Sequence, residues 1–145
     1  MSAALETLPL WLTVAATAQL CVAVLNLFLV RLLHWRDDLN RAPLLLREVF
    51  HVHSWFISVT LLIFGAVTLR FASEMSAEPM GRWLAAGIGG FWALRTILQL
   101  AYYSSSHWRG NTPRTVIHVI LLILYGGMAT TYLCAAFLPH PGVPL

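Results

Sequence analysis

The chain has 145 residues, of which 59% are hydrophobic and only 10% are charged. A soluble domain usually carries about 25% charged residues, so this composition excludes an ordinary soluble globular domain. Nine basic and six acidic residues give a formal net charge of +3, which is too small and too scattered for a nucleic-acid-binding surface. We therefore expect one integral membrane domain over residues 1–145, solvated in part by the lipid bilayer.

Four apolar segments are long enough to cross a membrane, which takes about 20 mostly apolar residues per helix. We expect them at approximately residues 10–33, 44–71, 83–103 and 115–138. Pro43 and Pro113 suit the first turn of a helix, and the sequence Glu78-Pro79-Met80-Gly81 breaks the chain before the third segment. Because the connections are short, consecutive helices should be antiparallel neighbours. The sequence thus predicts an all-α fold, an up-down bundle of four transmembrane helices.

The placement of arginine predicts how the bundle is oriented. The first and third connections and their flanks hold most of the basic residues: Arg31, Arg36, Arg41, Arg47, Arg109 and Arg114. The second connection has two arginines that Glu74 and Glu78 offset, and the two tails have no basic residue. The positive-inside rule therefore places both termini on the non-cytoplasmic side. A bacterial inner membrane is the expected location, and a eukaryotic organelle membrane is the alternative.

Ionisable and aromatic residues gather toward the predicted cytoplasmic ends of the helices. Placing an ionisable side chain within a membrane costs free energy, so such residues are candidate functional residues. Helical spacing places Glu48, His51 and Trp55 on one face of the second segment, and Arg95, Gln99 and Tyr102 on one face of the third. The candidate site residues are Asn26, Glu48, His51, Trp55, Arg95, Gln99, Tyr102, His118 and Tyr125.

Two histidines, His51 and His53, compete for the inward position on the second segment. They lie on different sides of the helix, and the face that Glu48 and Trp55 share favours His51. Each residue of the cluster also has a plain structural interpretation, such as a buried ion pair between Glu48 and Arg95. A bundle that only had to pack could use leucine, alanine and glycine instead, so the combination favours a functional pocket.

The first functional hypothesis is a redox or metal centre. His51 and His118 are predicted at similar depth on different helices, where they could be the two axial ligands of a haem. Together with Glu48 they could also hold a single transition metal. A di-iron site is excluded, because it needs two Glu-x-x-His elements and two further glutamates within the membrane.

The second hypothesis is a site that binds or converts a lipophilic small molecule, such as a lipid, an isoprenoid or a quinone. His51 or His118 would act as acid or base with Glu48 tuning it, and Arg95 would hold a phosphate, a carboxylate or a developing oxyanion. The remaining candidates, Asn26, Trp55, Gln99, Tyr102 and Tyr125, would line the pocket. No motif specifies a reaction, so the sequence leaves open whether the protein is an enzyme.

The third hypothesis is a non-catalytic accessory or assembly subunit of a larger membrane complex. Ala85 and Gly89, like Ala86 and Gly90, form pairs of small residues four positions apart, which allow close contact between helices. These pairs are interpreted as packing positions within the bundle, with a homo-oligomer seam, such as that of a homodimer, or a flat wall against a planar ligand as the alternatives.

Overall fold

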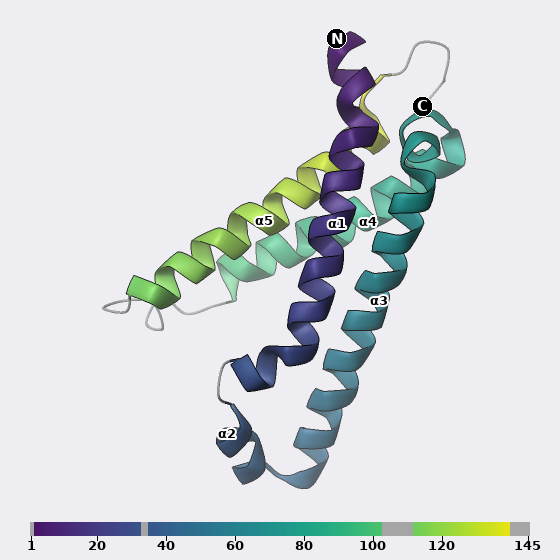
Figure 1. The fold of residues 1–145 in the computed structure, drawn as a ribbon. Helices are drawn as coiled ribbons and strands as arrows, with labels where there is room; N and C mark the ends of the chain where they lie inside the picture. The colour runs from purple at the N-terminus through teal and green to yellow at the C-terminus, as the bar shows by residue number, and fades with distance from the viewer. Residues whose placement is uncertain (1, 33–34, 103–111, 140–145) are drawn as a thin grey trace.

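The computed structural model describes residues 2–32, 35–102 and 112–139, and every element in these ranges is an α-helix (Figure 1). The helices are α1 (Ser2–Leu32), α2 (Arg36–Arg41), α3 (Leu44–Ala77), α4 (Pro79–Ala101) and α5 (Thr112–Phe137). All except the short α2 are long and apolar enough to cross a membrane. The all-α prediction with four potential membrane-spanning helices is therefore confirmed.

The helix ends differ in detail from the predicted ones. α3 continues six residues past its predicted end at Phe71, whose φ of −125° and ψ of 28° lie outside the helical range and form a kink. Pro79 does not precede the third long helix but begins it, because the missing N–H of proline costs nothing in a first turn. α1 begins at Ser2 rather than near residue 10. The predicted end of the third segment, Tyr103, lies outside the described residues.

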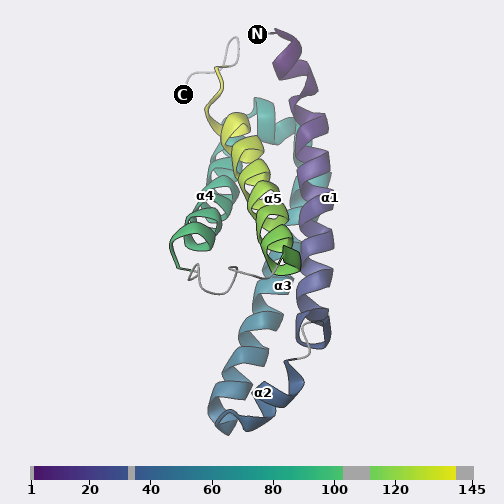
Figure 2. The same cartoon turned by 90° about the vertical axis from the view of Figure 1, so that its left-hand side faces the viewer.

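The four long helices form two antiparallel pairs, α1 with α3 and α4 with α5. The pairs touch each other over shorter stretches, mainly through α3 with α4 and α1 with α5. Figure 1 shows the pairs close together near the N-terminus of α1 and spread apart toward α2. Figure 2 shows α1 and α3 extending beyond α4 and α5 on the side of α2. The interior is therefore concentrated at one end of the molecule.

The interior of this junction is built from a few large side chains and many small ones. Leu12, Ile88, Trp92 and Tyr132 are among its fully buried members. Gly89 lies so close to α5 that a Cβ atom there would come within 2.9 Å of the Leu133 side chain. Small residues allow such close backbone approach, which drives helix association where lipid removes most of the hydrophobic difference between inside and outside.

Most of the helical surface is apolar and faces outward. Only 22–33% of the residues in each potential membrane span are buried inside the protein. Large side chains such as Trp55, Phe56 and Ile123 are more than half exposed. Contiguous apolar exposure on this scale is incompatible with water and is expected where lipid covers the surface.

Candidate functional site

Four of the predicted site residues come together on the α4–α5 pair, and we call them the Arg95 cluster: Arg95, Gln99, His118 and Tyr125. Arg95 Nη1 donates a hydrogen bond of 2.9 Å to Gln99 Oε1. Gln99 Nε2 lies 2.8 Å from His118 Nδ1, within hydrogen-bond distance. The guanidinium carbon of Arg95 lies 4.9 Å from the centre of the Tyr125 ring, in a cation–π contact.

Helical geometry explains why these side chains meet. Arg95 and Gln99 are one turn apart on α4, so their side chains are neighbours on one face. Gln99 and Tyr125 are buried, whereas Arg95 and His118 are half-buried. The cluster thus has a buried amide at its centre and a cation and an imidazole at its edges.

A second set of contacts connects the Arg95 cluster to the interior. Tyr125 stacks on Trp92 with ring centres 5.3 Å apart. The Trp92 indole N–H donates to Gln19 Oε1 at 2.7 Å, and Gln19 Nε2 donates to the Leu61 backbone oxygen at 3.0 Å. Gln19 therefore joins α1, α3 and α4 through a single buried amide.

Gln19 and Trp92 are absent from the sequence-predicted site, although one signal pointed to Gln19. It is a polar residue at membrane depth on the same face of α1 as Asn26, and buried polar groups must find partners. Its partner could not be inferred, because the partner depends on how the two helix pairs dock.

The predicted residues on α3 do not join the Arg95 cluster. Glu48, His51 and Trp55 are all exposed on the α3 surface, and His53 is exposed too, so neither histidine is buried in the bundle. The physical reason is the spread between the helix pairs: α3 makes few contacts with α5, and its N-terminal half extends away from α4 and α5.

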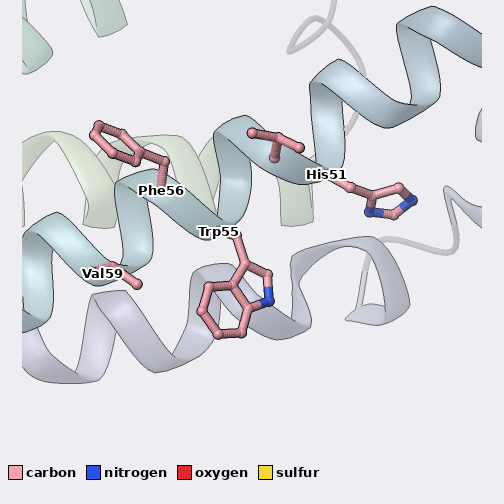
Figure 3. Close-up of a pocket in the computed structure, with 5 residues that line it drawn as sticks. His51, Trp55, Phe56 and Val59 are labelled. Atoms are coloured by element: carbon pink, nitrogen blue, oxygen red, sulfur yellow. The ribbon is translucent and has the colours of Figure 1, made fainter.

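The exposed face of α3 carries a shallow hollow of about 400 Å³ (Figure 3). His51, Val52, Trp55, Phe56 and Val59 line it, and all of them belong to α3. Figure 3 shows Trp55 and Phe56 leaving the helix on opposite sides. A hollow lined by one helix is an open surface feature and not an enclosed pocket.

The two remaining predicted site residues have other roles. Asn26 Nδ2 donates to the Ser54 backbone oxygen at 3.0 Å and to Ser58 Oγ at 2.8 Å, which holds α1 against α3. Tyr102 follows the last residue of α4 and is highly exposed. Neither residue contributes to the Arg95 cluster in this structure.

The predicted metal ligands are not assembled. Within the described residues, no three or more His, Cys, Asp or Glu side chains lie close enough together to hold a metal ion. Glu48 and His51 are on the exposed part of α3, while His118 on α5 is held by Gln99. The haem hypothesis used the same pair of histidines, and they come from two helices that make few contacts.

An arginine outside the predicted site is also buried. Arg82 Nε donates to the Ala136 backbone oxygen at 2.9 Å, and Nη2 donates to the Leu138 backbone oxygen at 3.1 Å. Ala136 lies in the last turn of α5 and Leu138 directly follows its end, where the helix dipole favours a cation. Arg82 Nη1 is buried without a hydrogen-bond partner among the described residues. Arg82 therefore acts as a cap that ties the start of α4 to the end of α5.

Comparisons with known proteins leave the site to be judged on its own geometry, since no protein-family model matches the chain and no characterised protein or solved structure is significantly similar to it.

Proposed function

We propose that this protein binds a lipophilic small molecule, such as a lipid, an isoprenoid or a quinone, at the Arg95 cluster. The observation that carries the proposal is the hydrogen-bonded series from Arg95 through Gln99 to His118, within helices that could cross a membrane. Placing a charged guanidinium at this depth of an apolar bilayer costs several kcal/mol. Such a side chain is therefore expected where it contacts a polar group. Arg95 and His118 are each half-buried, so both side chains reach the surface of the α4–α5 pair.

The arginine distribution supports a location for this site. Arg36 and Arg41 on α2 lie at the connection between α1 and α3, which the positive-inside rule assigns to the cytoplasm of a bacterial inner membrane. α4 then enters from the non-cytoplasmic side at Pro79 and ends in the cytoplasmic half at Ala101. Arg95 and Gln99 are in its last two turns, so the ligand would enter from the cytoplasmic leaflet.

Binding is better supported than chemical conversion. In the hypothesis of acid–base catalysis, a nearby carboxylate raises the basicity of the histidine, and Glu48 was expected in that role. Glu48 is exposed on α3, and the Arg95 cluster contains no carboxylate. The cluster therefore combines a cation, an amide, an imidazole and an aromatic face, which suit recognition.

Lipid analysis of the purified protein tests the proposal. The protein is extracted from its own membranes in a mild detergent, and co-purifying lipophiles are quantified by mass spectrometry for the wild type and for Arg95→Ala. Arg70→Ala is a matched control, because Arg70 is also an arginine on an aromatic ring, at 5.1 Å from Phe71, but is exposed elsewhere on α3. We expect one lipophile to be enriched in the wild type and control and depleted in Arg95→Ala. Identical profiles in all three would refute the proposal.

The exposed part of α3 favours a second candidate, an accessory subunit of a membrane complex. α3 has 34 residues and is therefore about 50 Å long, longer than a hydrocarbon core of about 30 Å. The hollow that Trp55 and Phe56 help to line lies in its N-terminal half. That half of α3 extends away from α4 and α5 (Figure 1). A photo-crosslinking amino acid at Phe56 should then capture a partner protein in cells, with the same group at Ile123 on α5 as control. Crosslinks to lipid alone at both positions would count against this role.

A further inference from the structure

We propose that the molecule bound at the Arg95 cluster carries an oxyanion head, a carboxylate or a phosphate, an inference that rests on the proposed binding function. It follows from the direction of the hydrogen bonds in the cluster, which can be assigned from the chemistry of one residue.

Arg95 fixes that direction because a guanidinium can only donate hydrogen bonds. Its contact with Gln99 at 2.9 Å therefore requires the amide oxygen of Gln99 to face Arg95. The Gln99 amide nitrogen then faces His118 Nδ1 at 2.8 Å, and an amide nitrogen also only donates. His118 Nδ1 must accept, which places the hydrogen of the neutral ring on Nε2.

The acceptor atoms of Gln99 and His118 are consequently turned inward, within the cluster. Gln99 Oε1 faces Arg95 and His118 Nδ1 faces Gln99, while Gln99 itself is only 3% exposed. The other ring nitrogen of His118 and the other guanidinium nitrogens of Arg95 all carry hydrogen. A ligand group that contacts these nitrogens must therefore accept hydrogen bonds.

The positive charge of Arg95 decides which acceptor is preferred. A planar guanidinium matches the two oxygens of a carboxylate or phosphate, and charge-assisted hydrogen bonds are roughly twice as strong as neutral ones. Tyr125 lies beneath the guanidinium at 4.9 Å and is itself stacked on Trp92. This support holds the charge at membrane depth instead of letting the side chain extend to the headgroups.

Photoaffinity labelling tests the head group directly. The protein is reconstituted in phosphatidylcholine nanodiscs and labelled with a diazirine-bearing fatty acid or with the matching fatty alcohol. We expect the acid to label α4 or α5 at least about tenfold more than the alcohol, the scale of one charge-assisted hydrogen bond. Competition separates the sources of the oxyanion: displacement by lysophosphatidate alone indicates a lipid head, and displacement by inorganic phosphate as well indicates a soluble anion.

Two variants test whether the preference for the acid over the alcohol depends on the Arg95 cluster. Arg95→Gln should lose the preference for the acid, and Arg70→Gln should keep it. His118→Asn retains an acceptor for Gln99 but lacks the Nε2 donor, so acid labelling should fall while the fold is kept; it carries the test if Arg95→Gln does not fold. Equal labelling by acid and alcohol, unchanged in both cluster variants, would overturn the oxyanion inference and leave lipophile binding standing. No specific labelling by either probe would overturn both.

Discussion

A glutamine at membrane depth directs the hydrogen bonds of its neighbours at two places in this protein. Gln99 turns its oxygen to Arg95 and its nitrogen to His118, and Gln19 turns its oxygen to Trp92 and its nitrogen to the Leu61 carbonyl. Each amide satisfies one donor and one acceptor of its neighbours. The Gln19 contact also joins the two helix pairs, so its energy should be visible in the stability of the whole molecule.

A double-mutant cycle should measure the Gln19–Trp92 hydrogen bond. Gln19→Leu leaves the Trp92 indole N–H without its acceptor, and we expect a loss of about 1–3 kcal/mol in the free energy of unfolding. Trp92→Phe removes the donor together with part of the stacking on Tyr125. The double variant should cost less than the sum, with a coupling of about 0.6 kcal/mol and at most about 1.7 kcal/mol. Denaturant titration of the four proteins in detergent measures this, and strictly additive losses would contradict it.

Residues that meet through local geometry were the predictable part of the site. Arg95 and Gln99 are one helical turn apart, and His118 and Tyr125 follow from pairing α4 with its neighbour α5. The contacts that the sequence analysis expected between the two helix pairs are not the ones that the structure has. Glu48 and His51 are exposed on α3, and Gln19 takes a partner that depends on docking.

At the scale of one element, α4 has two faces that use small residues differently. Ala85 and Gly89 are buried against α5, where a Cβ on Gly89 would lie 2.9 Å from Leu133 Cδ2 and 3.1 Å from the Leu133 backbone nitrogen. Gly90 is the next residue, and a Cβ there meets nothing within 4 Å. Of the two predicted small-residue pairs, Ala85 and Gly89 are both buried. In the other pair, Ala86 is half-buried against the core and Gly90 is exposed.

Substituting the two adjacent glycines separates packing from helix propensity. Gly89→Ala forces the Leu133 side chain to shift and crowds the Leu133 backbone nitrogen, and we expect a loss of about 1–3 kcal/mol in the free energy of unfolding. Gly90→Ala should be neutral or gain up to about 1 kcal/mol, because alanine is the better helix former and space is open. Thermal unfolding in detergent compares the two variants. Equal destabilisation by both would show that the α4–α5 contact is not as close as described.

The end of α5 depends on a side chain of another element. Arg82 on α4 donates to the backbone oxygens of Ala136 and Leu138, so Arg82→Gln should expose these carbonyls and loosen the last turn. We expect faster hydrogen exchange in the final turns of α5, equivalent to about 1–3 kcal/mol of local stability. Arg70→Gln, which removes an exposed arginine, should leave this exchange unchanged. Unaltered exchange in Arg82→Gln would mean that the cap is dispensable.

At the scale of the whole molecule, two tight helix pairs meet at one end and diverge at the other. The number and nature of the long helices could be predicted, because a run of apolar residues long enough to cross a membrane is a strong signal. The divergence could not be predicted. Both the lipid-facing and the protein-facing sides of such helices are apolar, so the contrast that marks the inner face of a soluble helix is missing. The relative tilt then depends on packing contacts such as the T-shaped Phe64–Phe91 pair.

Cysteine labelling should establish which leaflet holds the Arg95 cluster. In a protein whose two native cysteines, Cys21 and Cys134, are replaced by alanine, single cysteines are introduced at Asp37 on α2 and at Glu78 between α3 and α4, both exposed positions. A membrane-impermeant maleimide should label Glu78→Cys in intact cells and Asp37→Cys only after the membrane is permeabilised, because arginines surround Asp37 and the positive-inside rule retains them in the cytoplasm. Labelling of both sites in permeabilised cells controls for reactivity. The reverse pattern would place both termini in the cytoplasm and the Arg95 cluster in the opposite leaflet, where its ligand would have to be sought.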